Sequence, residues 1–144
     1  MNTSNNCPVL FVEDSRSFRE TVIHRYLKQC TVTMLESGKR FRAELDENDF
    51  HFILMDYQLA GEYSGEDLVM IAREAGYDGA IIGVSSSEYL NHKLLRAGAD
   101  VVLTKRERYL LPKVIRQGLS LAEARGNEIR CEYGQESRSS TGSE

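Results

Sequence analysis

Four short apolar segments of this 144-residue chain are each followed by residues suited to phosphate chemistry. These are the acidic pair Glu13-Asp14, the acidic Asp56, the hydroxyl of Ser85 and the amine of Lys105. If the carboxylates converge to ~5 Å, each pair repels by about 3 kcal/mol at an effective dielectric of about 20, so the group needs a cation. Such oxygen ligands suit Mg²⁺, which leaves coordination positions open for phosphate oxygens. With a serine and a lysine beside them, the set predicts phosphoryl transfer to a carboxylate.

The elements that must position these groups are five short apolar or β-branched runs, too short for helices. The second run alternates threonine with apolar residues, which is typical of an edge strand. The other four are continuously apolar, as expected for parallel strands covered on both faces. The runs are Val9–Val12, Thr31–Leu35, Phe52–Met55, Ala80–Val84 and Val101–Leu103.

Segments with helical periodicity lie between and after these runs. Their apolar positions fall within 18–27, 41–45, 68–75, 90–97 and 111–122. Ser17-x-x-Glu20 predicts a capping box for the first helix, and Ser64-x-x-Asp67 predicts one for the third. Pro112 fits the first turn of the fifth helix, where a missing N–H costs nothing.

Strict alternation of strands and helices predicts an α/β fold with a doubly wound parallel sheet. In such sheets, functional groups gather at the carboxyl ends of the strands, near the switch point in strand order. The candidate residues follow four different strands, so we expect them to meet at one edge of the sheet.

The composition of the chain argues against several classes of function. Hydrophobic residues make up 41% of the chain and charged residues 28%, which is typical of a globular domain. A net charge of −4 argues against direct binding of nucleic acid over the whole surface. No apolar run is long enough to span a membrane, and the N-terminus lacks the pattern of a signal peptide. Three cysteines without a C-x-x-C motif indicate neither a disulfide framework nor a zinc site, and they favour the cytoplasm.

The organisation along the chain is a folded unit with short flanks. We expect residues 1–7 to be flexible, 8–125 to form the folded domain and 126–144 to form a polar, mostly disordered tail. The tail offers only Ile129, Cys131 and Tyr133 for burial. The three histidines are scattered, with no helical ligand pair, and we expect them to be surface or half-buried residues: His24, His51 and His92.

Four motifs in the expected order resemble the receiver domain of two-component response regulators, the CheY-like family. They are Glu13-Asp14, Leu54-Met-Asp56, Val84-Ser85-Ser86 and Ala97-Gly-Ala-Asp-Val-Val-Leu-Thr-Lys105. Taken singly, each has a plain structural explanation as a cap, a turn or a solvated residue. Together they cover residues 8 to about 125, and the resemblance implies a flavodoxin-like (βα)5 fold with strand order 2-1-3-4-5.

The resemblance also implies a role for each residue. Asp56 would accept the phosphoryl group, and Mg²⁺ would be held by Glu13, Asp14, Asp56 and the backbone carbonyl of Gln58. The phosphoryl group would be bound by Ser85, Ser86 and Lys105. Gln58 and Ser87 would line the path of the hydrolytic water and set the lifetime of the phosphate.

Three departures from the family pattern affect this assignment. The loop Leu59–Gly65 lacks the usual proline, and its glycine comes one residue later than usual. Lys105 is followed by Arg106 instead of proline, so we expect this loop to lack the family's cis bond. Val102 stands where the family usually has an aromatic switch residue. In the family this ring moves together with the switch hydroxyl, here Ser85, and a valine has no ring to make that movement.

The resulting hypothesis is a single-domain receiver, without an output domain, whose phosphate comes from a histidine kinase or histidine phosphotransfer protein. Its output would be a protein contact, with homodimerisation left open, and it would not be an enzyme acting on other molecules. A phosphorylation-independent pseudo-receiver is the alternative, which Val102 favours. A phosphatase is less favoured, because Gln58 stands where that chemistry needs a second acid. The contact surface would be the face of the fourth helix, fifth strand and fifth helix, around Tyr89, His92, Lys93, Arg96, Val102 and Tyr109.

Overall fold

The computed structural model describes residues 7–128 and 131–134 and contains one five-stranded parallel sheet. The strand order is β2-β1-β3-β4-β5, which confirms the expected topology and the edge position of β2. The strands are β1 (Cys7–Val12), β2 (Cys30–Leu35), β3 (Phe52–Met55), β4 (Ala80–Ser85) and β5 (Val101–Thr104).

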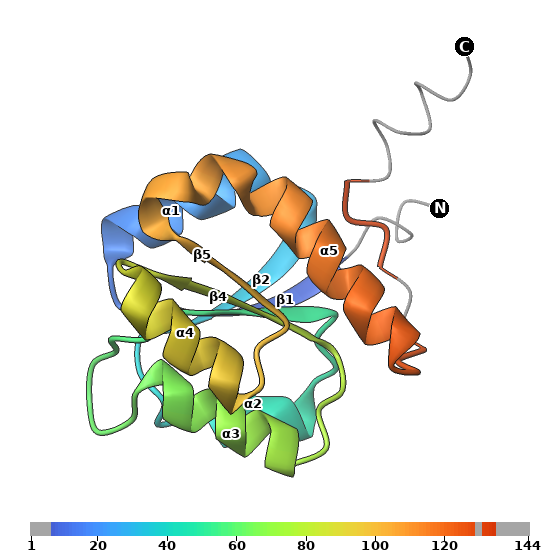
Figure 1. The fold of residues 1–144 in the computed structure, drawn as a ribbon, viewed down its shortest axis with the longest axis horizontal. Coiled ribbons are helices and arrows are strands. Elements are labelled where there is room, and N and C mark those ends of the chain that lie inside the picture. The colour runs from blue at the N-terminus through green and yellow to red at the C-terminus, as the bar shows by residue number, and fades with distance from the viewer. Residues whose placement is uncertain (1–6, 129–130, 135–144) are drawn as a thin grey trace.

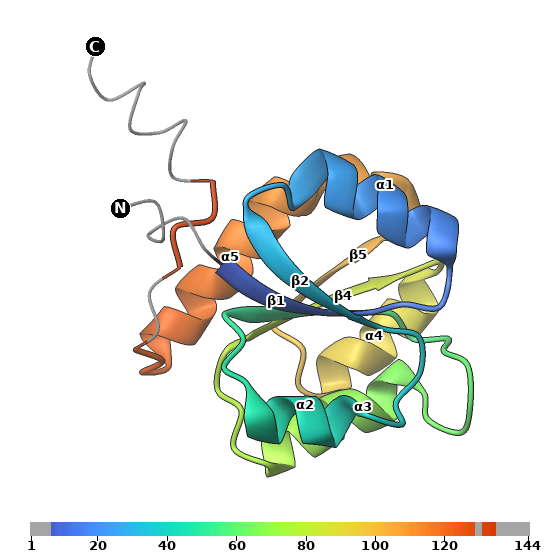
Figure 2. The ribbon, with the colours of Figure 1, turned by 180° about the vertical axis from the view of Figure 1, so that it is seen from behind.

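Helices cover both faces of the sheet (Figures 1 and 2). One face carries α1 (Arg16–Tyr26) and α5 (Leu111–Ala124), and the other carries α2 (Phe41–Glu47), α3 (Gly65–Glu74) and α4 (Glu88–Ala97). A short 3₁₀ helix, η2 (Lys105–Leu110), leads from β5 into α5.

The core is divided into two layers by the sheet. Val9 and Phe11 of β1 belong to the layer under α1 and α5. Leu10 and Val12 of the same strand belong to the layer under α2, α3 and α4. This alternation follows from the two-residue period of a strand, and it explains why the central strands carry apolar residues on both faces.

The predicted helix cap is confirmed for α3 and is wrong for α1. Ser64 and Asp67 form the predicted capping box, with the Ser64 hydroxyl accepting from the Asp67 N–H. In α1 the N-cap is Ser15, whose hydroxyl accepts from the Phe18 N–H, so the prediction of a cap at Ser17 was wrong. The helix begins two residues earlier because the chain turns into it soon after β1 ends at Val12.

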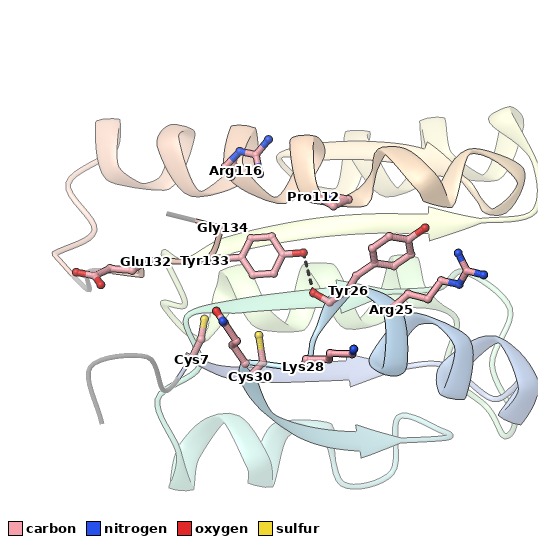
Figure 3. A pocket seen from close by; sticks show the side chains of 11 residues that line it. Cys7, Arg25, Tyr26, Lys28, Cys30, Pro112, Arg116, Glu132, Tyr133 and Gly134 are labelled. Carbon is pink, nitrogen blue, oxygen red and sulfur yellow. Dashed lines mark hydrogen bonds between the residues drawn. The ribbon is translucent and has the colours of Figure 1, made fainter. Parts of the chain in front are cut away.

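Residues near both ends of the chain pack into the core, which the sequence did not predict. Cys7 was assigned to a flexible N-terminus, but it begins β1 and is buried. Cys131 and Tyr133 were assigned to a disordered tail, but both pack against the core layer under α1 and α5. The Tyr133 hydroxyl donates to the Tyr26 carbonyl at 2.8 Å (Figure 3), and its ring meets Phe52 edge to face. The rest of the predicted tail, 129–130 and 135–144, and residues 1–6 lie outside the described residues.

Within the described ranges, no helix combines the length and apolar character needed to cross a membrane.

Candidate functional site

Three acidic side chains meet where β1 and β3 end side by side. The pairing of Val12 with Met55 brings the residues that follow them together, and the Asp56 N–H donates to the Val12 carbonyl at 3.1 Å. Glu13, Asp14 and Asp56 each offer a carboxylate oxygen, all within 4.8 Å of one another. This is the switch point of the strand order, because the helix after β1 and the helix after β3 cover opposite faces of the sheet.

Lys105 reaches this acidic group from the end of β5. Its Nζ lies 2.9 Å from Glu13 Oε2 and 3.3 Å from Asp56 Oδ2. The same Nζ stands 4.6 Å from the centre of the Phe18 ring, a cation–π contact that holds the amine over α1. The lysine therefore partly balances two buried carboxylates drawn from distant parts of the chain.

Two backbone N–H groups hold the carboxylates in place, and one buried cation holds the backbone at Glu13. The Tyr57 N–H donates to Asp56 Oδ1 at 2.7 Å, and the Ser15 N–H donates to Glu13 Oε2 at 3.1 Å. Arg19 lies under the acidic group and donates from its guanidinium to the Glu13 carbonyl at 2.8 Å. The sequence alone does not reveal these contacts, because two come from the backbone and Arg19 has the pattern of a solvated helix residue.

Burial changes the protonation of the two inner acids. Desolvation, reinforced by the nearby Asp56 charge, raises the pKa of Glu13 to about 7, although Lys105 opposes the rise. Desolvation also raises the pKa of Asp56, against the pull of Lys105 and the Tyr57 N–H. Asp14 is exposed at the rim of the site. A cation bound here would relieve the crowding that favours protonation of the inner acids.

The donor set fits a hard divalent cation. Glu13 Oε1 is buried and accepts no hydrogen bond from the described residues, so it has a free lone pair inside the site. The cluster presents carboxylate oxygens alone, which is the chemistry that Mg²⁺ prefers. Gln58, whose carbonyl the resemblance adds to the ligand set, lies in the exposed loop two residues beyond Asp56.

The serine segment follows the next strand along the sheet. Ser85 ends β4 and is fully buried, and its hydroxyl donates to the Ser87 carbonyl at 3.0 Å. Ser86 is exposed, while the Ser87 hydroxyl caps α4 by accepting from the Leu90 N–H at 3.1 Å. The Ser85 hydroxyl thus ties the end of β4 to the start of α4.

Val102 fills a specific space in the sheet. It pairs with Gly83 across β4 and β5. A Cβ on Gly83 would stand 2.9 Å from Val102 Cγ1 and 2.8 Å from a Leu94 methyl. The valine and the leucine of α4 therefore close over the glycine, and Val102 packs into the core layer beneath α4.

The lengthened loop returns to the backbone of the acceptor strand through Gly65. Its N–H donates to the Tyr57 carbonyl at 2.7 Å. A Cβ at this position would stand 1.9 Å from the Asp56 carbonyl oxygen. Glycine is required here by the close approach of two backbones. No cis peptide bond occurs in the described residues, in keeping with Arg106 in place of proline.

A comparison with protein families identifies the family of this chain. A family model described as the response regulator receiver domain matches residues 9–116. No curated protein sequence matches the chain significantly.

Solved structures share the fold. A CheY-like receiver domain protein from Methanospirillum hungatei JF-1 is 23% identical, with a TM-score of 0.70 over 83% of this chain and 98% of that chain. The Francisella response regulator 1452 receiver domain is 21% identical, with a TM-score of 0.68 over 85% and 100% of the two chains. The response regulator domain of Thermotoga maritima CheB is 21% identical, with a TM-score of 0.69 over 79% and 96%.

Proposed function

Because this chain belongs to the response regulator receiver domain family, we propose that it is a switch controlled by phosphorylation of Asp56. The phosphoryl donor is a histidine kinase or a histidine phosphotransfer protein. The observation that carries the proposal is the convergence of Glu13, Asp14, Asp56 and Lys105 at the carboxyl edge of the sheet.

In the transfer step, a carboxylate oxygen of Asp56 attacks phosphorus as the phosphorus–nitrogen bond of the donor breaks. The electron pair of that bond returns to the donor histidine. The Tyr57 N–H holds Asp56 Oδ1, and Lys105 contacts Oδ2, so the carboxylate is oriented before attack. Glu13, Asp14, Asp56 and the Gln58 carbonyl would hold Mg²⁺, which would neutralise the phosphoryl charge when bound. Lys105 moves from the carboxylates onto a phosphoryl oxygen as negative charge accumulates.

Phosphorylation would act on the remainder of the chain through Ser85. A phosphoryl group on Asp56 gives the Ser85 hydroxyl and the Ser86 segment a stronger acceptor than the Ser87 carbonyl that Ser85 now contacts. Releasing that carbonyl frees the loop before α4, whose first turn Ser87 caps. With Val102 locked over Gly83, this loop carries the signal in place of an aromatic ring.

The output is a protein contact on the face formed by α4, β5 and α5. Two tyrosines stand out on this face: Tyr89 is 70% exposed and Tyr109 is 67% exposed. Lys93 lies between aromatic rings, 5.2 Å from the Tyr89 ring centre and 5.7 Å from that of Tyr57. Tyr57 adjoins Asp56, so this stack links the acceptor to the surface of α4. A partner with acidic and apolar groups fits this surface.

The chain acts on its own phosphate and is not an enzyme for other substrates. Gln58 is exposed and lies two residues beyond the acceptor. Its side chain is an amide, so it cannot serve as the general acid that repeated turnover would need. Together with Ser87, it tunes the access of hydrolytic water. Three free thiols in the described part of the chain fit the reducing cytoplasm that we propose as its compartment.

The test is stoichiometric phosphorylation. Reduced protein is incubated with acetyl phosphate and Mg²⁺, and the intact mass is measured. We expect a gain of one phosphoryl group that is absent in D56N and absent when EDTA replaces Mg²⁺. The packing of Val102 over Gly83 supports one alternative, a pseudo-receiver that acts without phosphate. Unmodified wild-type mass, with D56N retaining full partner binding, would establish that alternative and overturn the proposal.

A further inference from the structure

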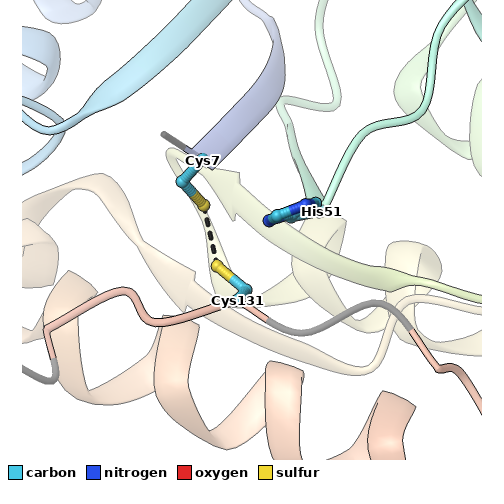
Figure 4. Close-up of side chains that lie close together, drawn as sticks. All are labelled: Cys7, His51 and Cys131. Atoms are coloured by element: carbon cyan, nitrogen blue, oxygen red, sulfur yellow. Dashed lines mark hydrogen bonds between the residues drawn. The ribbon is translucent and has the colours of Figure 1, made fainter. Parts of the chain in front are cut away.

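A second cluster of ligating side chains lies at the opposite end of the sheet from Asp56. Cys7 Sγ, Cys131 Sγ and an imidazole nitrogen of His51 all lie within 4.8 Å of one another (Figure 4). The two sulfurs are 2.7 Å apart. These residues begin β1, precede β3 and belong to the C-terminal segment, so the fold alone brings them together. We propose that Cys7, His51 and Cys131 bind a zinc ion.

The cluster is positioned by contacts that do not depend on its own side chains. The His51 N–H donates to the Pro8 carbonyl at 2.8 Å, which fixes the histidine beside the start of β1. Cys131 stands two residues before Tyr133, whose hydroxyl and ring are anchored on Tyr26 and Phe52. Cys7 is held within β1, paired with Cys30 of β2. Three independent segments thus present two sulfurs and a nitrogen to one point.

The imidazole supplies the observation that points to a metal. His51 Nδ1 is buried and has no hydrogen-bond partner among the described residues. A buried nitrogen without a partner is unfavourable, and a metal bound through Nδ1 would satisfy it. A disulfide between Cys7 and Cys131 would leave it unsatisfied. A site made of thiolate and imidazole ligands binds zinc in preference to Mg²⁺ or Ca²⁺.

The thiols also favour a cation at this point. Their sulfurs lie 2.7 Å apart, and two thiolates this close would repel each other without a cation between them. Zinc supplies that charge, with the sulfurs separating to the ~3.8 Å that a tetrahedral site with ~2.3 Å zinc–sulfur bonds requires. Cys131 is only partly buried, so its side chain can move by this amount.

The surroundings provide a way in for the ion. Cys30, the strand partner of Cys7, lies beside the cluster and lines the same cavity. A cavity of about 300 Å³ is lined by Cys7, Cys30 and Tyr133 and runs beside α1 and α5 (Figure 3). Zinc reaching the cluster by this route would fasten the C-terminal segment to the start of β1. The site does not depend on phosphorylation of Asp56.

Zinc content of the full-length chain tests the proposal. Protein reduced with a phosphine is incubated with ZnCl₂ and Mg²⁺, passed through a desalting column, and analysed for metal by mass spectrometry. We expect about one zinc per chain in wild type, and at least a tenfold lower content in H51A and in C131S. The matched control H92A removes a histidine outside the cluster and should retain zinc, as should D56N, which removes a carboxylate of the other site.

Cobalt substitution and mass measurement complete the test. Co²⁺ should give thiolate-to-metal absorption bands in wild type and H92A that are lost in C131S. Circular dichroism verifies the folding of each variant, and C131S serves in place of C7S because Cys7 is buried in a strand. Zinc contents of H51A and C131S equal to that of wild type would overturn the proposal. Failure of reduced wild type to take up zinc, with a 2 Da mass loss on exposure to air, would also overturn it and identify a disulfide pair.

Discussion

The Lys105 ammonium and the Glu13 carboxylate form an ion pair at 2.9 Å although 92 residues separate them in the chain. The pair couples the end of β5 to the end of β1, across the strands that lie between them. Glu13 is fully buried and the Lys105 side chain is 24% exposed, so the acid depends on the lysine for much of its compensation. Removing the lysine would leave two carboxylates at the edge of the core without their cation.

We therefore expect K105A to destabilise the metal-free protein by about 1–3 kcal/mol at pH 8, above the Glu13 pKa of about 7. The loss should be smaller at pH 6, because protonation of Glu13 removes one of the unpaired charges. Urea unfolding in EDTA measures both values. K113A, which removes an exposed lysine of α5, is the control and should change stability by less than about 0.5 kcal/mol. Equal losses for the two variants at pH 8 would contradict the role given to Lys105.

Glu13 should make the stability of the metal-free protein depend on pH. Its folded pKa of about 7 exceeds its ordinary value of 4.5, so between these values the folded chain binds more protons than the unfolded chain. The stability from this group is complete below pH 4.5 and is lost as pH rises to about 7. The difference in unfolding free energy between wild type and E13Q, measured in EDTA, should follow this window. A difference that is flat from pH 4.5 to 7.5 would show that the carboxyl titrates normally.

Gly65 should resist substitution because of the backbone opposite it. In G65A the new methyl would stand 1.9 Å from the Asp56 carbonyl oxygen, so either the loop or the acceptor strand must shift. We expect a loss of about 2–3 kcal/mol, together with slower phosphorylation by acetyl phosphate. G76A is the control, because it introduces backbone strain without a clash: Gly76 has φ +92°, and no atom lies within 4 Å of the added methyl. That control should cost about 1 kcal/mol and leave phosphorylation unchanged.

The sequence predicted the parts of the molecule that follow from local pattern and from one rule of parallel sheets. Apolar runs located all five strands, and the rule that strand ends share an edge brought together Glu13, Asp56 and Lys105. Arg19 escaped prediction because it acts on a backbone carbonyl that only the fold places above it. The role of Gly65 likewise depends on how closely two backbones approach.

The cysteine cluster shows where sequence patterns fail. Metal motifs are recognised by ligands spaced a few residues apart on a hairpin or helix. Cys7, His51 and Cys131 lie on three segments with no such spacing, and they meet only when Tyr133 docks beside Phe52. Cys131 was set aside because no second cysteine or histidine stands at a metal-motif spacing from it. The polar composition of its segment also conceals the anchoring role of Tyr133.

Asp100 should be a strong determinant of stability. It precedes β5, and its carboxylate accepts from the Ile81 N–H and from the Arg73 guanidinium, both at 3.0 Å, and from Arg125. The carboxylate is 7% exposed, so D100A leaves two guanidinium groups facing each other without a counter-charge. We expect a loss of about 2–4 kcal/mol in urea unfolding. D49A, at an exposed position, should cost less than about 0.5 kcal/mol, and a similar effect of the two variants would be contrary to this account.

Ser85 should separate phosphorylation from its consequence. Its hydroxyl contacts the Ser87 carbonyl, away from the groups that hold Asp56 for attack, so S85A should still be phosphorylated by acetyl phosphate to at least half the wild-type extent. The change around α4 should be lost, because no hydroxyl remains to move from the Ser87 carbonyl to the phosphoryl group. Amide NMR shifts induced by beryllofluoride report this directly, with the Leu90 N–H as the probe because it donates to the Ser87 hydroxyl that caps α4. S120A, which removes the hydroxyl of an exposed serine in α5, is the control and should retain the Leu90 shift. A full Leu90 shift in S85A would show that the loop responds to phosphate by another route, and Val102 would then be the next residue to replace.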